Sequence, residues 1–544
     1  MSRPNPVILL GILAAIFVVW SGVSLLGEGL YIAKHEGDTL HFIEIVLRMA
    51  EGQRPHLDFM TPIGGLAFAP VALMVKAGLG IGHAFLWSQI VVALVLLPAV
   101  WWVSLSRLSP RLAPVFGGIV LVLVLALVHG EANGAISVSM HYNRWAWAVA
   151  FIAILAAFKA PVHPNVPALD GLIIGLIVAA MVMIKVTYAA GFALPVALAL
   201  WVTGQKRALA WAVLTGGAVV VALTLWLGPD YWLAYLRDLL IVSGSDIRPQ
   251  PSGDFKDVVA SPAYLGASLT LLAGVVFMRQ ARDDTGGLIL LTLVPGFFFV
   301  TYQNYGNDPQ WLLLLGVLLL ASRPVHDLTN ASGWSMRQVL GTTAAVALAM
   351  GAPSLINVAY SPFRHSLTDP AEFVPLMPRG GVHTDLHGGD VRVRRIDGRI
   401  ALDGPESAYA AYLEPQAREK IADFKGETFD FCTTEIGLTS VLDMTARDLE
   451  AAGYGGTGAR IFAADLLSSY WLFGDFEPII GAAPWYYGGL PGYENVDYVV
   501  VPLCPIAHSV QADILDELEA SGAAEELVEV RRTPVYILYQ RQRG

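Results

Sequence analysis

The sequence predicts a polytopic α-helical membrane protein with a C-terminal soluble α/β domain. Only 15% of its 544 residues are charged and 55% are hydrophobic, whereas about 25% of an average soluble chain is charged. The charges are also divided along the chain, with 19 basic and 17 acidic residues in 1–351 but 15 basic and 28 acidic in 352–544. This composition excludes a disordered or nucleic-acid-binding protein and argues against a wholly soluble enzyme.

Eleven apolar runs are long enough to cross a bilayer when their polar ends reach the interface. We expect spans at 7–26, 84–103, 112–129, 143–158, 169–184, 188–203, 208–227, 261–278, 286–300, 309–321 and 337–355. The first run is expected to stay as a span, because its apolar core is long and no small-x-small cleavage site precedes the polar loop.

The run 63–78 is also apolar, but it is short and contains glycine and proline. If it does not span and the N-terminus is inside, every inside loop carries a lysine or arginine, as cytoplasmic loops do. We therefore expect 63–78 to be a juxtamembrane or re-entrant segment of a first outside loop, 27–83. The chain is then a multi-pass protein of the bacterial inner membrane, with a cytoplasmic N-terminus and a periplasmic C-terminal domain.

After a transmembrane domain at 1–355, we expect a Pro-rich linker at 356–378 and an α/β domain at 379–544. Alternating residues predict a hairpin at 391–402 around Asp397-Gly398. The pattern further predicts helices at 436–452 and 509–521, strands at 459–464 and 496–503, and a final hairpin or edge pair of strands at 525–542. The chain's two cysteines, Cys432 and Cys504, both fall here, and the sequence leaves open whether they form a disulfide or two buried thiols.

Ionisable residues gather most densely in the outside segment 27–65, and functional sites of membrane proteins collect such residues near water-filled cavities. His35, Glu36 and Asp38 precede an amphipathic helix expected over 39–52, with apolar residues at 40, 43, 46, 47 and 50. That helix is expected to lie along the membrane surface. Asp38 is equally a candidate N-terminal cap for it, which would need no chemistry.

A recognisable order of features runs through this loop. An acidic residue just beyond the first span precedes the amphipathic helix, a Gly-x-x-Pro-x-x-Asp-Phe turn at 52–59 and a Pro-x-Gly-Gly segment at 62–65. The arrangement resembles that of GT-C class membrane glycosyltransferases, which use polyprenyl-phosphate sugars and include protein mannosyltransferase-like and aminoarabinose-transferase-like enzymes. The resemblance covers the membrane half. It implies an inverting hexosyl- or pentosyltransferase with a first-loop carboxylate as base and a polyprenyl phosphate as leaving group.

Carried over to this chain, the resemblance implies that Asp38 is the base, with Glu36 second and Asp58 third. The family often has an adjacent acidic pair, whereas Gly37 separates Glu36 from Asp38 here. A base must be unprotonated and within hydrogen-bond reach of the acceptor. Either His35 or Lys34, next to these carboxylates, is expected to hold the base ionised.

A phosphate leaving group calls for cations. The candidates are Arg144 at the outside end of 143–158, Lys185 between 169–184 and 188–203, and Arg248 in a Pro/Gly-rich loop. Asn304 is a candidate for binding sugar hydroxyls. The alternatives are structural: Arg144 as an interfacial anchor and Lys185 snorkelling to the interface.

The implied partners are a polyprenyl-phosphate-linked sugar, the lipid bilayer and a glycan, lipid or protein acceptor, with a protein partner for the acidic C-terminal domain as a further option. No cofactor is predicted. A divalent metal stays open as an option, because some GT-C enzymes use one through paired carboxylates, although no dedicated ligand spacing is present here. Two other functions stay open: a non-catalytic GT-C-like scaffold, and a transporter of a lipid-linked substrate.

Overall fold

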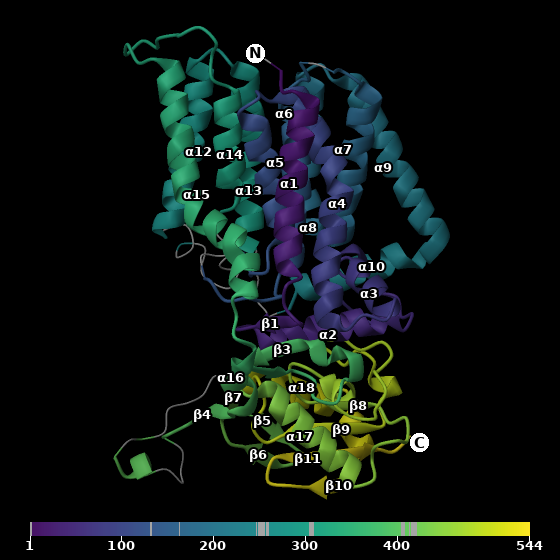
Figure 1. Ribbon diagram of the computed structural model, residues 1–544. Coiled ribbons are helices and arrows are strands. Elements are labelled where there is room, and N and C mark those ends of the chain that lie inside the picture. Colours follow the sequence, from purple (N-terminus) through teal and green to yellow (C-terminus); the bar gives the residue numbers. More distant parts are fainter. Residues whose placement is uncertain are drawn as a thin grey trace.

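The computed structural model describes residues 3–130, 133–162, 164–245, 247, 256, 261–303, 309–403, 408–412, 414 and 422–543. It has two stacked regions (Figure 1). One is a bundle of roughly parallel helices with the N-terminus at its far end. The other is an α/β region, formed by the last third of the chain, at the opposite end.

Every apolar run expected to span forms a helix of the bundle. The helices are α1 (Pro6–Ser24), α4 (Ile81–Arg107), α5 (Leu112–Leu125), α6 (His141–Phe158), α7 (Pro167–Ile184), α8 (Val186–Val202), α9 (Lys206–Leu227), α12 (Pro262–Gln280), α13 (Asp284–Gln303), α14 (Trp311–Ala321) and α15 (Met336–Ser366). In the part of the chain that the structure describes, seven helices are long and apolar enough to cross a membrane, namely α1, α4, α7, α9, α12, α13 and α15. Helices α5, α8 and α14 are apolar but shorter, so a total of eleven spans remains a prediction.

Short helices lie across the end of the bundle that faces the α/β region (Figure 1). They are α2 (Glu36–Ala50), α3 (Ala69–Lys76) and α10 (Asp230–Ser243). Helix α2 confirms the amphipathic helix predicted in the first outside loop. Helix α3 has eight residues, or about 12 Å at 1.5 Å per residue, which is too short to cross a bilayer.

The expected linker at 356–378 is wrong, because helix α15 continues to Ser366 through Pro353 and Pro362. Side chains on this extension bind the loop that follows α5. Asn357 donates to the carbonyl of Asn133, and Arg364 donates to the carbonyl of Gly134. These tertiary contacts stabilise the helix where the local sequence suggests its end. Helix α5 itself ends at Leu125, four residues before the predicted limit of its span.

A small sheet joins the first outside loop to the chain beyond α15. Strand β1 (Leu30–Ile32) runs parallel to β3 (Leu386–Gly389), which pairs antiparallel with β2 (Phe373–Pro375). The approach is close at Gly29, where an added Cβ would lie 2.2 Å from the carbonyl oxygen of Asp385. The loop and the C-terminal region therefore share backbone pairing.

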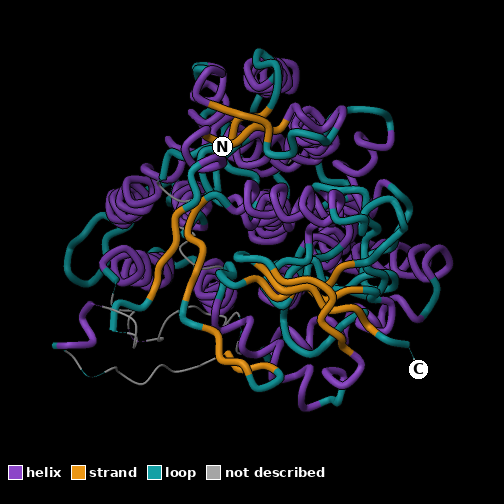
Figure 2. The backbone as a smooth tube through the Cα atoms, turned by 90° about the horizontal axis from the view of Figure 1, so that it is seen from below, coloured by secondary structure: helices purple, strands orange, loops and turns teal. Residues whose placement is uncertain are grey.

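The main sheet of the α/β region has the order β10-β11-β9-β8, and its strands lie side by side in Figure 2. It consists of β8 (Ile461–Ala463), β9 (Tyr498–Pro502), β10 (Leu527–Arg532) and β11 (Tyr536–Arg541), with helices α17 (Leu438–Ala451) and α18 (His508–Ala520). A separate pair is formed by β5 (Ala422–Phe424) and β6 (Glu427–Phe429). The predicted helices, the inner strand and the final hairpin are confirmed.

The predicted hairpin at 391–402 is wrong. Residues Asp390–Arg394 form the short helix α16, and β4 (Asp397–Ile400) pairs antiparallel with β7 (Cys432–Ile436). Cys432 forms a disulfide with Cys504, with their Cα atoms 4.8 Å apart. This bond and the hydrogen bond from Thr434 N to the carbonyl of Pro505 (2.8 Å) fasten β7 to the segment after β9. Strand β4 thus pairs with the distant strand β7 instead of forming the predicted local hairpin.

Candidate functional site

Asp38 lies in the first turn of α2, and its side chain points toward the loop before α6. His35 occupies the cap position with a left-handed backbone (φ 68°), so the predicted capping role of Asp38 is wrong. The hydroxyl of Ser139 donates to the Asp38 carboxylate over 2.7 Å. The carboxylate is thus fixed by a neutral hydroxyl from another element.

His35 belongs to the same polar group. Its Nδ1 lies 3.0 Å from the hydroxyl of Ser137, and that hydroxyl accepts from the backbone N–H of Ser139. The ring of His129, in the loop after α5, lies 5.1 Å from the His35 ring. Burial, assisted by nearby His35, lowers the pKa of His129 to about 4. His129 is therefore neutral at pH 7 and does not compete for the Asp38 carboxylate as a cation.

Two neighbouring spaces meet beside this group. The first, the Asp38 pocket, has a volume of about 20 Å³ and is lined by Asp38 and Ser139 among others. The second, the Lys185 cavity, has a volume of about 180 Å³ and is lined by Lys185 and by Tyr487 of the C-terminal region among others. Met140 and Tyr142 line both spaces, so the space lined by Asp38 adjoins the space lined by Lys185.

Lys185 is placed by a break in the helical bundle. Helix α7 ends at Ile184 and α8 begins at Val186, with Lys185 extended between them. The Pro-x-Gly-Gly segment braces the break, because the N–H of Gly64 donates to the carbonyl of Ile184 (3.2 Å). A Cβ on Gly64 would lie 2.0 Å from the carbonyl oxygen of Met183. The Lys185 ammonium then lies 5.5 Å from the centroid of the Tyr142 ring.

The other candidate carboxylates are held by arginines. Both oxygens of Glu36 accept from Arg392 of α16, one of them over 2.8 Å, which ties α2 to the C-terminal region. Asp58 accepts from the backbone N–H of Arg54 (2.7 Å) and pairs with the Arg54 Nε (3.2 Å). Neither Glu36 nor Asp58 is among the described residues that line the two cavities.

Arg144 lies near the start of α6 and is fully buried. Its guanidinium donates to the carbonyls of Val128 and Ala126, the latter over 2.9 Å. Both carbonyls belong to the segment that follows the last residue of α5, and the carbonyl of Ala126 also accepts from Gln89 (3.2 Å). Arg144 thus binds backbone rather than lining either cavity. The predicted substrate residues Arg248 and Asn304 lie outside the described residues.

Several site residues escaped sequence analysis. Ser137 and Ser139 lie in the polar stretch directly before α6, and Tyr142 lies in the first turn of α6. That polar stretch was a usable local signal. Tyr487 carries no such signal, since it comes from the far C-terminal region. The ring of Trp485, its near neighbour, lies 5.7 Å from the ring of His41 on α2. Long-range packing alone brings these aromatic side chains to the site.

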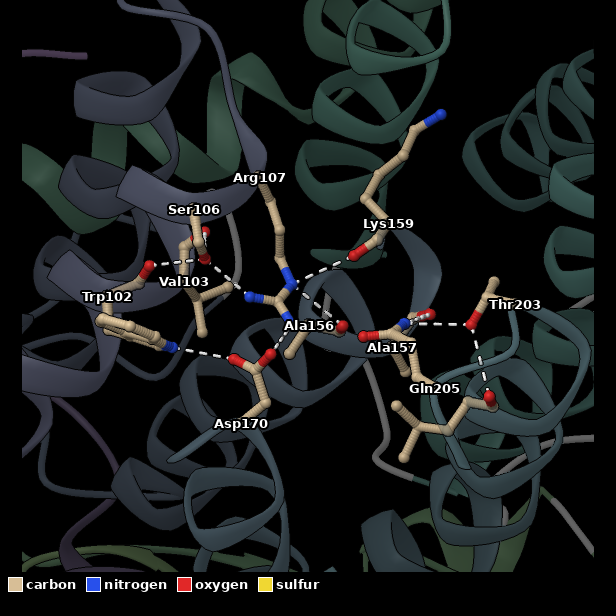
Figure 3. A network of polar contacts seen from close by, with 11 residues as sticks. Trp102, Val103, Ser106, Arg107, Ala156, Ala157, Lys159, Asp170, Thr203 and Gln205 are labelled. Carbon is tan, nitrogen blue, oxygen red and sulfur yellow. Dashed lines mark hydrogen bonds and ion pairs between the residues drawn. The ribbon is translucent and has the colours of Figure 1, made fainter. Parts of the chain in front are cut away.

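A second buried polar cluster lies at the bundle end near the N-terminus (Figure 3). Arg107, expected in a cytoplasmic loop, pairs with Asp170 of α7 over 2.9 Å, and both side chains are almost fully buried. The Nε of Arg107 also donates to the carbonyls of Ala156 and Lys159 at the end of α6. The indole of Trp102 donates to Asp170 over 2.8 Å. This cluster ties α4, α6 and α7 together.

Among the described residues, no group of three or more histidine, cysteine, aspartate or glutamate side chains could hold a metal ion. No family model and no curated protein matches the chain. Among solved structures, the chain is similar to the crystal structure of the Archaeoglobus fulgidus oligosaccharyltransferase in complex with zinc and sulfate. The TM-score is 0.38 and the identity 13%, over 91% of this chain and 68% of that chain. No residue role follows from a likeness of this degree.

Proposed function

We propose that this chain is an integral-membrane glycosyltransferase that moves a sugar from a polyprenyl-phosphate donor to an acceptor on the extracytoplasmic face. The observation that carries the proposal is the shared wall of Met140 and Tyr142 between the Asp38 pocket and the Lys185 cavity. A carboxylate base removes the acceptor proton, and a cation stabilises the departing phosphate. The acceptor oxygen attacks the anomeric carbon, the bond to the phosphate breaks, and the configuration inverts.

Asp38 is the proposed base, oriented by Ser139, and Lys185 is the proposed phosphate-binding cation. Glu36 and Asp58 rank after Asp38 as candidate bases, because their carboxylates already form ion pairs with arginines. His35 supports the base through the hydroxyl of Ser137. Arg144 supports the fold of the site by binding the backbone carbonyls after α5. Arg248 and Asn304 remain proposed substrate contacts.

We place the proposed reaction on the periplasmic side because basic residues in the loops assign those loops to the cytoplasm. The N-terminus is cytoplasmic, eleven helices cross the bacterial inner membrane, and the first loop and C-terminal region are periplasmic. The sugar is a hexose or pentose, and the acceptor is a glycan, lipid or protein. The acidic surface of the C-terminal region is available to a protein partner. The proposed chemistry uses no bound metal, so chelation with EDTA is expected to leave the rate unchanged.

The test is sugar transfer by the full-length protein in nanodiscs, with a radiolabelled polyprenyl-phosphate sugar as donor. Asp38→Asn is expected to lower kcat by about 100-fold or more, the range of a lost general base. Asp58→Asn is the matched control and is expected to keep most of the rate. Lys185→Gln is expected to raise KM for the donor and to lower kcat. Full activity of Asp38→Asn, Glu36→Gln and the double variant would contradict a base at either position.

A non-catalytic scaffold is the second candidate. The observation that favours it is the structural use of polar groups predicted for the site: Arg144 binds helix carbonyls and Glu36 binds Arg392. A scaffold would co-purify with a larger membrane complex and transfer no sugar from any polyprenyl-phosphate donor. A glycosyltransferase would turn over such a donor as an isolated protein.

A further inference from the structure

A lateral groove of about 700 Å³ lies between α3, α7, α9 and α10. Apolar side chains dominate its lining, chiefly Leu176, Ala180 and Met183 of α7 and Val219, Leu223 and Trp226 of α9. The adjoining surface of α9 is strongly apolar and exposed, as shown by Leu225 at 83%. The groove therefore opens on the side of the bundle that faces lipid.

The groove exists because α7 and α9 touch at one end and separate toward the other. Gly171 and Gly175 bring the backbones together, since an added Cβ would lie 2.4 Å from the Ala208 carbonyl oxygen and 2.5 Å from that of Ala212. Beyond this contact, α9 leaves α7 and approaches α10 (Figure 1). Residues 176–183 and 219–227 then face each other across open space.

Cations mark the end of the groove near α2 and α3. Arg54 and Lys76 are among the lining residues, and no acidic residue among those described lines the groove. Asp58 pairs with the Nε of Arg54. Lys76, in the last turn of α3, is exposed and has no ion-pair partner among the described residues. The apolar groove thus ends in positive charge at the level of the juxtamembrane helices.

This space is separate from the Lys185 cavity. Ile63 lines the cavity and Gly65 lines the groove, so the Pro62–Gly65 segment stands between them. Gly64 packs so tightly against Met183 that not even a methyl group fits between. A chain lying in the groove therefore keeps its head group near Lys76 and away from Lys185.

We propose that the groove binds one acyl chain of an anionic bilayer phospholipid, with the lipid phosphate against Lys76 and Arg54. Lipid chains are as apolar as the helix surface, so the apolar lining alone favours no particular lipid. Basic side chains near the membrane surface attract anionic head groups, and this attraction supplies the preference. The site is independent of the proposed transferase reaction.

The test is native mass spectrometry of the full-length protein released from vesicles of equal dioleoylphosphatidylglycerol and dioleoylphosphatidylcholine. Wild-type protein is expected to retain one phosphatidylglycerol in preference to phosphatidylcholine. Lys76→Gln is expected to weaken this preference by about fivefold, the value of one basic residue at a membrane surface. Lys206→Gln is the matched control, because Lys206 is an exposed lysine at the other end of α9.

Two neighbouring positions on α9 test the groove itself. Val219→Trp fills the space and is expected to abolish lipid retention, whereas Val220→Trp is expected to have no effect, because Val220 is 48% exposed and does not line the groove. A photoreactive phosphatidylglycerol should also crosslink to residues 176–183 or 219–227 of the wild-type protein, which needs no variant to fold. The proposal would be overturned if both lipids were retained equally, or if the two tryptophan variants behaved alike. It would also be overturned by crosslinks outside these residues, or if stoichiometric polyprenyl phosphate displaced phosphatidylglycerol.

Discussion

At the scale of single residues, the charges near the outer end of the bundle differ in what holds them. Glu36 would have to break a two-pronged pair with Arg392 before meeting a substrate. The Asp38 carboxylate accepts a hydrogen bond from the hydroxyl of Ser139, a neutral donor. Exchanging a hydrogen bond from a neutral hydroxyl costs less than separating a two-pronged pair of a carboxylate and a guanidinium. This difference places Asp38 first among the three carboxylates.

The buried pair of Arg107 and Asp170 gives a prediction about stability. Asp170→Ala leaves the Arg107 charge buried without its partner, which is expected to cost about 3–5 kcal/mol of unfolding free energy. Restoring neutrality with Arg107→Ala in the same chain should recover some of that loss, so the double variant is less destabilised than the sum of the single variants. Denaturant unfolding of the detergent-solubilised protein measures the cycle.

Asp284→Ala is the control for this cycle. Asp284 is 78% exposed and its nearest contact with Arg279 is 3.7 Å, so the change is expected to stay within about 0.5 kcal/mol. Strict additivity of the Arg107 and Asp170 variants would show that the pair in Figure 3 does not couple the two helices.

At the scale of elements, local patterns were predictable and distant pairings were not. The apolar runs and α2 follow from hydrophobic spacing within a few turns, and the inner strand β9 follows from a short apolar run. Strands β1, β2 and β3 have only three or four residues each, and β1 pairs Leu30 with Leu386. No local pattern encodes that register. The extension of α15 through two prolines likewise depends on contacts with Leu127 and Gly134.

The residues of the candidate site also fall into those that local sequence could predict and those that needed the fold. Asp38 and Lys185 could be singled out from sequence, because charges are scarce beside apolar runs and each remaining one is conspicuous. Ser139 needed the fold of the loop before α6, and Tyr142 needed the placement of the first turn of α6. Tyr487 needed the docking of the whole C-terminal region, since more than 300 residues separate it from Tyr142.

The Cys432–Cys504 disulfide joins β7 to the segment after β9 and is expected to stabilise the α/β region. It closes a loop with a sequence separation of 72 residues, and its removal is expected to cost about 2–4 kcal/mol because the unfolded chain regains freedom. Melting of the full-length protein with and without dithiothreitol measures this loss. The Cys432→Ser/Cys504→Ser variant should melt, with or without dithiothreitol, at the melting temperature of the reduced wild-type protein. An unchanged melting temperature after complete reduction would contradict the prediction.

At the scale of the whole molecule, the C-terminal region and the first outside loop form one body. Arg48 of α2 binds Glu44 (2.9 Å) and the carbonyl of Ile479 (2.9 Å), and Ser469 donates to Glu44 (2.7 Å). Arg48 and Glu44 are almost fully buried. The helix that begins beside Asp38 is therefore held between the bundle and the α/β region, so a shift of that region would also move the proposed base.

This arrangement makes the two ends of the chain report on the number of spans. An odd number of crossings puts the N-terminus and the C-terminal region on opposite sides, as their places at opposite ends of the bundle require (Figure 1). The shortest bundle helix is α14, whose 11 residues extend about 17 Å. Its crossing therefore depends on local thinning or on polar ends reaching the interface.

We expect alkaline phosphatase fused after Gly544 to be active in a bacterial host and a green fluorescent protein fused there to be dark. Fusions after Ser109, between α4 and α5, should give the reverse, because the basic residues Arg107 and Arg111 favour the cytoplasm. If α14 fails to cross, ten crossings remain and the fusion after Gly544 becomes fluorescent, which would place the Asp38 pocket and the C-terminal region on different sides. Their shared contacts through Arg48 forbid that outcome, so the two fusions test the fold and the topology together.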